Sequence, residues 1–229
     1  MARASSHIDV YLEIGAKRTF AGALDWPGWA RSGRDEAASL QALFEYGPRY
    51  ERALRQSRLG FRAPKDSSEF SVRERLAGNA TTDFGAPDLP TAHDSDPIDA
   101  ADLRKFQAVL KAGWRAFDAA VAAAQVKELR TGPRGGGREL DKIVQHLLES
   151  DAGYLASLGV RFKFAEGGDL EQELGRTRQA TLRALSSASS GDSPKLGPRG
   201  GVRWTPRRFV RRVAWHLLDH AWEIEDRIL

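Results

Sequence analysis

The segment TPRRFVRRVAWHLLDHAWEIEDRIL, residues 205–229, shows the helical pattern on which our interpretation of the second half of the chain depends. It begins with Thr205 and Pro206, a good helix start because Thr can cap the first turn and Pro fits the first helical position. The apolar residues that share one side of this segment are Val210, Val213, Leu217, Ile224 and Ile228. We therefore predict a helix that reaches the C-terminus and buries one face against other helices.

Three more helical stretches precede this one. The first begins at Asp96-Pro97, the second covers residues 138–158, and the third begins after Asp169. Loops rich in Gly, Arg, Ser and Pro separate the four stretches. Since each stretch carries an apolar stripe, we predict an up-down four-helix bundle over residues 98–229.

The first part of the chain has strand patterns as well as a helix. Apolar and polar residues alternate over residues 8–14, which is typical of a strand, and strand character resumes at residues 20–24. A helix is predicted over residues 34–56, kinked or divided by Gly47-Pro48. We expect these elements to form a small module over residues 1–60.

Residues 61–97 are rich in Pro, Gly and Asp, and one strand is indicated at residues 69–76. We interpret this region as an irregular covering segment and linker. The predicted fold class is therefore α+β: a small N-terminal α/β sandwich-like module, this linker, and then the up-down four-helix bundle.

The composition restricts the chemistry that the chain can perform. Its 229 residues include five His but no Cys, which excludes disulfides, thiolate nucleophiles and metal sites built from Cys. A metal site must therefore use His, Asp or Glu. The net charge of +4 comes from 35 Lys and Arg against 31 Asp and Glu, so the chain is mixed rather than polycationic, which gives little support to a nucleic-acid partner.

No apolar run approaches the roughly 20 residues that are needed to span a bilayer. The N-terminus has no apolar stretch after its one charge, so it does not resemble a signal peptide. We therefore expect a cytoplasmic protein with no membrane partner.

Three of the five histidines fall on predicted helices. His216 and His220 are four residues apart, so both side chains lie on one face of the last helix. His146 lies midway along the second of the four helices. If these two helices are neighbours, three imidazoles and a water would make a tetrahedral metal site with an open position. His7 and His93 lie outside the helices, and we assign them no role.

The same histidines have a simpler interpretation. A single His in a helical bundle is most often a packed or hydrogen-bonded core residue. A pair of His four residues apart also arises by chance. From the residues alone, the metal site and the packed core His therefore stand as alternatives.

Residues 99–229 resemble the DinB superfamily, whose helical bundle also contains thiol-dependent transferases such as mycothiol-dependent maleylpyruvate isomerase. The resemblance rests on His146 in the second helix and on His216-x-x-x-His220 in the last. It implies that these three histidines bind one divalent metal, often with water completing the site. One feature departs from the family, because the bundle of its members usually begins near the N-terminus and here it follows another module.

The stretch Leu24-Asp-Trp-Pro-Gly-Trp-Ala-Arg-Ser-Gly33 is similar to the HicB signature, in which a strand ends in Leu-Pro-Gly and a Gly precedes a helix. The order of strand, strand, turn and helix agrees with that small α+β fold. HicB proteins are antitoxins with an attached DNA-binding domain; no such attachment is recognisable here, so that function is not transferred. We expect a module that packs against the bundle and shapes its cleft, with Trp26 and Trp29 as packing residues.

Two Gly- and Arg-rich loops lead into the helices that carry the candidate ligands. Arg134 and Arg138 lie in the first loop, and Arg203 lies in the second. Gly lets backbone amides approach an anion, and Arg binds carboxylate or phosphate through paired hydrogen bonds. These arginines are candidate anion contacts, with flexible solvated loops as the alternative.

Two acidic residues of the last helix are candidates for supporting roles. We predict that Glu223 acts as a general base or supports a metal ligand, and that Asp219 orients a ligating imidazole. Both assignments come from helical spacing.

The leading hypothesis is a DinB-like metal-dependent enzyme, a transferase, isomerase or hydrolase that acts on a small anionic or thiol-linked substrate. Zinc is the default metal, with nickel, iron, copper and manganese open. Any thiol would be an external low-molecular-weight cofactor, because the chain has no Cys. The alternatives are a non-catalytic protein that binds a metal, a ligand or a partner, and nucleic-acid binding through the Arg-rich loops. A homodimer is also left open.

Overall fold

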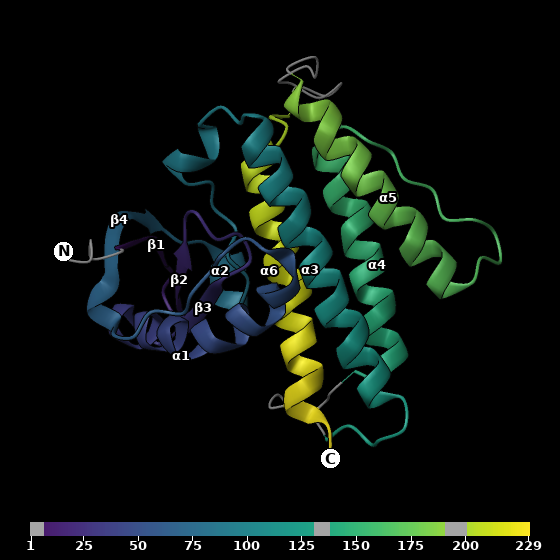
Figure 1. Cartoon of the computed structure of the whole chain (residues 1–229), viewed down its shortest axis with the longest axis horizontal. Helices are drawn as coiled ribbons and strands as arrows, with labels where there is room; N and C mark the ends of the chain where they lie inside the picture. Colours follow the sequence, from purple (N-terminus) through teal and green to yellow (C-terminus); the bar gives the residue numbers. More distant parts are fainter. Residues whose placement is uncertain (1–6, 131–137, 191–200) are drawn as a thin grey trace.

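The computed structural model describes residues 7–130, 138–190 and 201–229. In this part of the chain a four-stranded sheet lies beside a group of long helices, so the α+β class is confirmed (Figure 1). The strands are β1 Ile8–Ile14, β2 Thr19–Ala23, β3 Ala30–Gly33 and β4 Phe70–Ala77. The helices are α1 Glu36–Leu54, α2 Ala80–Phe84, α3 Ala100–Ala124, α4 Leu140–Ser157, α5 Leu170–Ser189 and α6 Pro206–Arg227. None of the described helices has the length and apolar character to cross a membrane.

The sheet has the strand order β3-β2-β1-β4. β2 runs antiparallel to both β1 and β3, whereas β1 and β4 are parallel. Strand β4 comes from the region that was expected to be a linker, so the sheet continues past the predicted module boundary at residue 60. The sequence predicts only a turn where β3 lies, because four residues are too few to show a clear alternation.

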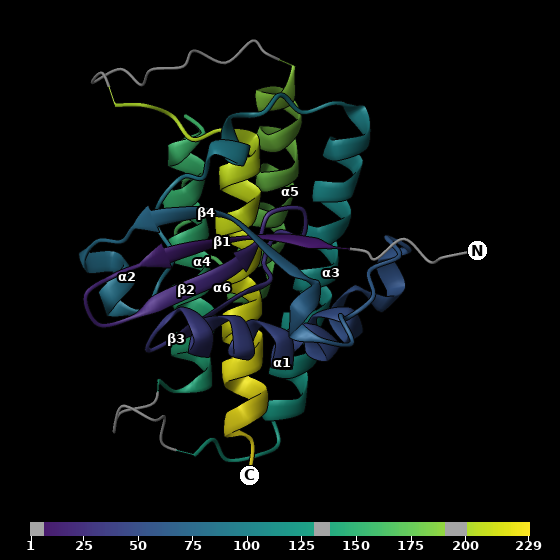
Figure 2. The same ribbon diagram turned by 90° about the vertical axis from the view of Figure 1, so that its left-hand side faces the viewer.

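Helix α1 packs against the sheet and closes the core of this module (Figure 2). The indole nitrogen of Trp29 donates to the Leu43 carbonyl at 2.9 Å, and its ring stacks on Tyr50. The Tyr50 hydroxyl in turn donates to the Pro27 carbonyl at 2.8 Å. Trp29 is buried and Trp26 packs beside it against the core, so both tryptophans are packing residues, as predicted.

Helix α1 runs unbroken through Pro48, so of the two predicted outcomes, a kink or a division at Gly47-Pro48, the division is wrong. A proline inside a helix removes one backbone hydrogen bond and strains the preceding turn. Here Tyr50 and Leu54, both beyond the proline, are buried in the core. Their packing holds the part of the helix beyond the proline against the core.

Helix α3 starts later than predicted, after Asp99 rather than at Asp96-Pro97. The Asp99 side chain accepts hydrogen bonds from the amides of Ala101 and Asp102 at 2.7 and 2.8 Å. These two bonds satisfy donors of the first helical turn that have no partner within the helix. The helix is therefore capped by Asp99, three residues after the Asp96 that was predicted as its cap.

Helices α3, α4, α5 and α6, called the long helices below, lie side by side in Figure 1, and contacts between their ends give their directions. Arg207 at the start of α6 pairs with Asp102 near the start of α3, so α3 and α6 are parallel. The Trp204 amide, just before α6, donates to the Ser157 carbonyl at the end of α4. Helix α4 therefore runs opposite to α6.

Helix α5 runs antiparallel to α3, since Gln107 near the start of α3 meets Ser186 near the end of α5. Helix α4 also runs opposite to α3, because α3 and α6 are parallel and α4 is opposite to α6. Helices α4 and α5 are therefore parallel, and the up-down order predicted from the sequence is wrong at the connection between them. The chain between residues 158 and 169 can span about 40 Å when extended, whereas the 18 residues of α4 span about 27 Å. The connection is thus long enough to return along α4 before α5 begins.

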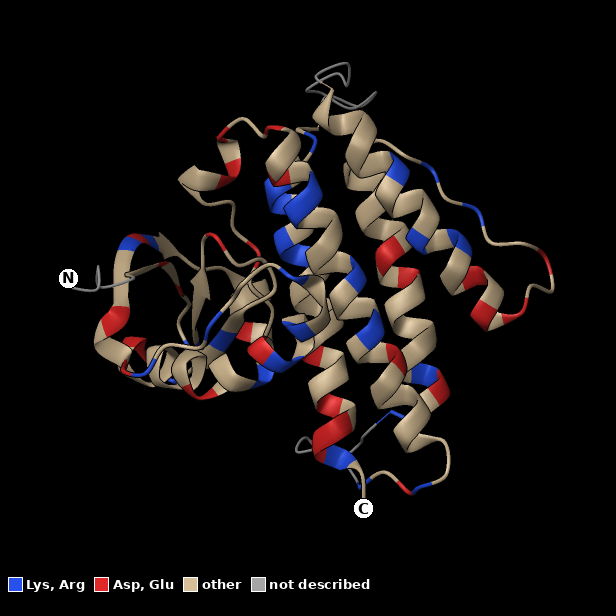
Figure 3. Ribbon diagram, viewed as in Figure 1, with Lys and Arg blue, Asp and Glu red and all other residues tan. Residues whose placement is uncertain are grey.

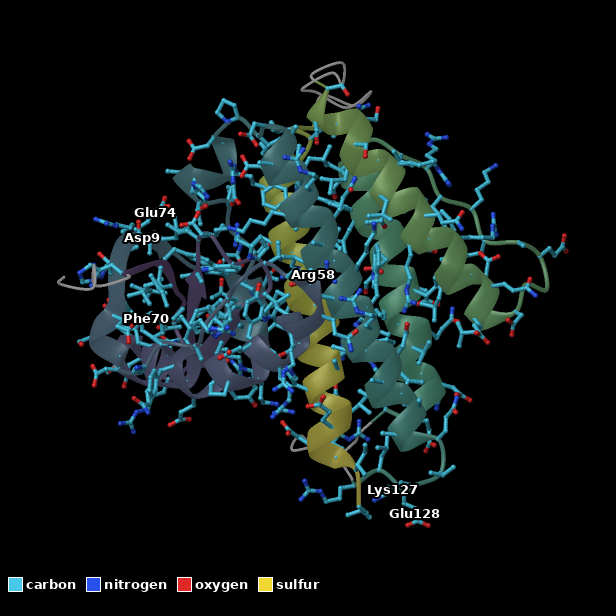
Figure 4. All side chains as sticks on the ribbon, in the orientation of Figure 1. Asp9, Arg58, Phe70, Glu74, Lys127 and Glu128 are labelled. Atoms are coloured by element: carbon cyan, nitrogen blue, oxygen red, sulfur yellow. The ribbon has the colours of Figure 1, made fainter. Side chains whose placement is uncertain are left out.

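The sheet and the helices share one core, and side chains fill the space between them (Figure 4). Gly28 lies where the turn before β3 meets α6, and its φ is 93°. A Cβ atom at this position would lie 2.9 Å from Cβ of Ala214, so any side chain would push the turn away from α6. The turn that carries the HicB-like signature thus contacts the helix that carries two of the candidate metal ligands.

A buried arginine connects the sheet to α6. The Arg211 guanidinium donates to both carboxylate oxygens of Asp94, to the Tyr11 hydroxyl and to the Leu89 carbonyl. Glu13, also fully buried, accepts a hydrogen bond from the Leu89 amide at 3.1 Å. These contacts fix the segment before α3 between the sheet and the helices.

Candidate metal centre

The three histidines predicted as ligands come together between α4 and α6. His216 Nε2 lies 3.2 Å from His146 Nε2 and 3.1 Å from His220 Nε2. His216 and His220 are one turn apart on α6, and His146 reaches them from α4, which is the antiparallel neighbour. His216 and His220 are buried and His146 is half-buried.

These separations fit a tetrahedral metal site. Zinc–imidazole bonds of about 2.0–2.1 Å at tetrahedral angles place the ligand nitrogens about 3.3 Å apart. Without a cation, His216 Nε2 faces two other ring nitrogens, and a neutral imidazole has only one N–H to offer them. His216 Nδ1 is buried and has no hydrogen-bond partner among the described residues. A divalent ion would accept the lone pairs of all three Nε2 atoms at once.

The surroundings keep two of these imidazoles neutral, which is the form in which His binds a metal. Burial and, to a smaller extent, the charges of Arg138 and His220 together lower the pKa of His146 to about 4. Burial also holds the pKa of His216 well below its usual value, and its two neighbouring histidines add to this shift. Their lone pairs are therefore available at neutral pH.

Glu223 contacts one of the candidate ligands directly. Its Oε2 atom lies 2.8 Å from His220 Nδ1, and its Oε1 atom accepts from Arg227 at 3.0 Å. The hydrogen bond with His220 is the main cause that lowers the pKa of Glu223. A proton shared on Nδ1 leaves His220 Nε2 as the ligand atom. Of the two roles predicted for Glu223, this contact favours the support of a metal ligand.

Asp219 faces the sheet instead of the histidines. Its Oδ1 atom accepts from Arg31 of β3 at 2.7 Å, and Arg31 also lies over the ring of Tyr46. No hydrogen bond or ion pair joins Asp219 to an imidazole within the described ranges. Asp219 thus ties α6 to the edge of the sheet, which differs from the role predicted for it.

A cleft of about 800 Å³ opens beside the three histidines, a size that suits a small molecule. One wall comes from α4 and α6 and includes Tyr154 and Trp215. The other wall comes from β2, β3 and the α2 region and includes Phe20 and Phe84. The cleft is therefore shared between the sheet module and the long helices.

The arginines predicted as anion contacts differ in their positions. Arg138 lines the cleft. Arg203 does not; it packs on Gly159 just after α4, where an added Cβ would lie 2.3 Å from the guanidinium carbon. This end of α4 lies away from the histidines. Arg134 lies outside the described residues.

Four other arginines line the cleft. Arg31 and Arg227 pair with acidic residues, and the other two are Arg18 before β2 and Arg212 on α6. The sequence did not single out either one. Arg18 lies in a short turn of the other module, and Arg212 is one of several arginines around the same helix. Only the packing of the sheet on α6 shows that both face the same space.

Comparison with known protein families, with curated proteins and with solved structures finds no match to this chain. The DinB and HicB resemblances therefore rest on the short motifs quoted above. What the fold and the candidate site define is a class: an α+β protein in which three histidines converge at one side of a cleft.

Proposed function

We propose that this chain is a divalent-metal-binding protein of the DinB type that acts as a metal-dependent enzyme, with His146, His216 and His220 as the ligands. The observation that carries the proposal is the convergence of three Nε2 atoms, with neighbouring atoms 3.1–3.2 Å apart, beside an open cleft. Zinc is the first metal to test, followed by nickel, iron, copper and manganese.

The arrangement of the long helices supports this proposal. We infer that α3, α4, α5 and α6 form a four-helix bundle with its metal ligands on facing helices, as in other metal-binding bundles. His146 comes from one helix and the pair His216 and His220 from its neighbour, and the DinB resemblance rests on the same three positions.

A divalent ion at this position would supply Lewis-acid chemistry, lowering the pKa of a water or a thiol that it binds. With these three ligands, a tetrahedral ion would keep one further position for water or substrate. Glu223 would hold His220 in the tautomer that presents Nε2, and Arg138 would attract an anionic substrate. The reaction class we propose is transfer, isomerisation or hydrolysis on a small anionic or thiol-linked molecule, and any thiol would be external.

Metal binding is tested first, on protein purified without a His tag. We expect about one equivalent of bound zinc, and after chelation a single tight site in a Zn²⁺ titration. The double variant His216→Ala/His220→Ala should lose this site, whereas His93→Ala should keep it because His93 pairs with Asp96 elsewhere. Zinc binding that is unchanged in the double variant would refute the proposed site.

A second experiment separates an enzyme from a protein that only holds a metal. Cobalt(II) in the site would give visible absorption bands that depend on its ligands. If a coordination position faces the cleft, azide should shift these bands in the wild-type protein. Bands that stay fixed at saturating azide would favour a sealed, non-catalytic site.

A further inference from the structure

The sheet module supplies part of the wall of the proposed metal cleft. Arg18, Phe20 and Ser32 come from the ends of β2 and β3, and all three line the cleft. Phe20 and Ser32 are cross-strand partners and therefore point to the same face of the sheet. Within the described residues, Arg18 donates only a long hydrogen bond of 3.4 Å to the Ser32 hydroxyl. Its guanidinium thus has further donors to offer.

Continuous ring contacts connect this wall to the histidines. The ring of Phe20 meets Trp215 edge to face, with centroids 6.0 Å apart. Trp215 lies 6.0 Å from the ring of His216, and the Arg212 guanidinium lies 4.9 Å above Trp215. A molecule that contacts the Phe20 side of the cleft is therefore only a few side chains away from the proposed metal position.

The cleft is lined by more arginines than carboxylates, and three of the arginines form no ion pair with a carboxylate among the described residues. Each carboxylate that lines it has a cationic or imidazole partner: Asp219 pairs with Arg31, Glu223 with Arg227 and His220, and Asp226 with Arg49. Among the described residues, Arg18, Arg138 and Arg212 line the cleft without an ion pair to any carboxylate. The cleft therefore has guanidinium groups whose charge no protein carboxylate neutralises.

We propose that the N-terminal module determines which substrate the cleft accepts, with Arg18 binding the oxyanion group of an organic anion. This inference rests on the proposed function, because it concerns the substrate of the same site. Arg212 and Arg138 face the same space and complete the positive surroundings. Carboxylate and phosphate groups both present two oxygen atoms that a guanidinium can bind with two parallel hydrogen bonds.

The aromatic residues of the cleft give the second half of the ligand chemistry. Phe20 and Trp215 pack on each other in the wall and are 2% and 4% exposed, whereas Phe84, at the sheet side of the cleft, is 75% exposed and offers most of the aromatic surface. Such a wall favours a ligand with an apolar or aromatic part next to its anionic group. The volume of about 800 Å³ suits a metabolite-sized molecule rather than a polymer.

The test uses the full chain, both metal-free and zinc-loaded, with benzoate and phenyl phosphate as probes. Benzamide and acetate are the comparison ligands, because one lacks the charge and the other lacks the ring. Binding is followed by tryptophan fluorescence, since Trp215 and Trp222 line the cleft. We expect one or both aromatic anions to bind at least about tenfold more tightly than benzamide or acetate, which is the order of one charge-assisted hydrogen bond pair.

The variant Arg18→Gln should weaken binding of the aromatic anion by about tenfold or more while Zn²⁺ affinity stays unchanged. Arg73→Gln is the matched control. Arg73 pairs with Asp9 on β1, which Figure 4 labels, and neither residue lines the cleft. Arg18 is half-buried and makes one weak hydrogen bond, so its replacement should not unfold the protein. The thermal midpoint of the variant checks this directly.

The two proposals fail in different ways. If the wild-type protein binds no zinc but binds aromatic anions through Arg18, the metal site is wrong and the role of the N-terminal module stands. If zinc binds through the histidines but Arg18→Gln leaves anion affinity unchanged, the inference about Arg18 is overturned. Equal affinity for benzoate, phenyl phosphate and benzamide in the wild-type protein would also overturn it.

Discussion

The two halves of α6 both bury polar side chains, but they satisfy them differently. In the first half, every nitrogen of the Arg211 guanidinium donates to a protein acceptor: Asp94, Tyr11 or Leu89. At the point where the second half begins, His216 is equally buried, yet its Nδ1 has no partner among the described residues and its Nε2 faces two other ring nitrogens. The first cluster is complete as a protein structure, whereas the second is the place where we propose that a cation binds.

The charges along α6 sharpen this contrast. Arginines gather in the first half, and acidic residues gather at the lower end of the helix in Figure 3. The helix dipole favours the opposite order, with acidic residues first and basic residues last. Charges placed against the dipole need partners from other elements, and Arg207, Arg211 and Asp226 each have one, namely Asp102, Asp94 and Arg49. Contacts with other elements, rather than helix stability, therefore explain these positions.

Breaking the completed cluster should have the largest effect on stability. Arg211→Met leaves the buried Asp94 carboxylate without its cation, which should lower the free energy of unfolding by about 3–5 kcal/mol. Denaturant unfolding of the metal-free protein measures this change. Adding Asp94→Asn in the same chain should recover part of the loss, since the orphaned charge is then removed. A single variant as stable as the wild type would show that the cluster does not hold the two modules together.

A buried acid on α4 tests whether every unsatisfied polar group marks a binding site. Asp151 is buried, its Oδ1 has no hydrogen-bond partner in the described part of the chain, and burial raises its pKa from 3.8 to about 7. Between these two pH values the folded protein keeps a proton that the unfolded chain loses, so stability falls as the pH rises through this window.

Asp151→Asn removes this titration and should stabilise the protein at pH 8 by up to about 4 kcal/mol, from a shift of about three pKa units. The difference from the wild type should shrink as the pH is lowered from 8 to 4. Unfolding curves at several pH values give both quantities. Zinc affinity should stay the same, because Asp151 belongs to no group of candidate ligands in the described part of the chain. A pH-independent difference would contradict the assignment.

Glu223 tests the site itself through a change in metal affinity. Glu223→Gln removes the negative charge that lies 2.8 Å from His220 Nδ1, and losses of about 10–100-fold are typical of such partners of a metal ligand. Competition with a chromophoric chelator at pH 7.5 measures the affinity. Glu223→Asp, which keeps the charge on a shorter side chain, should recover part of it. A loss in both variants that matches a loss of fold by circular dichroism would point to a structural role only.

Asp219 provides the matched comparison with the smallest expected effect. It lies on the same helix, but its partner is Arg31, and the pair is partly exposed. Asp219→Asn should therefore lower stability by only about 0.2–1 kcal/mol and leave zinc affinity unchanged. The same chelator competition applies. A drop in affinity as large as that of Glu223→Gln would restore the role predicted for Asp219 from helical spacing.

Helical periodicity predicted the long helices and two of their caps, because Asp169 and Thr205 each have a suitable first turn after them. The spacing of His216 and His220 placed two candidate ligands on one face, and a helical geometry alone is enough for that. The direction of α5 could not be predicted this way, since a loop of about 12 residues can either turn back at once or cross the bundle. The wall formed by Arg18 and Phe20 could not be predicted either, because it depends on how the sheet packs on α6.

By itself, the sequence determined the α+β composition, the helical positions and the limit that any metal site must use histidines and carboxylates. These follow from periodicity and residue type, which act over a few neighbouring residues. Only the tertiary structure decided that His146 meets the pair on α6, that Glu223 rather than Asp219 supports it, and that Arg18 faces the same cleft. His146 is 70 positions from His216, and Arg18 is about 200 positions from α6, so both placements depend on how whole elements pack. Glu223 and Asp219 lie on the same helix as His220, and the choice between them depends on which neighbours their side chains meet.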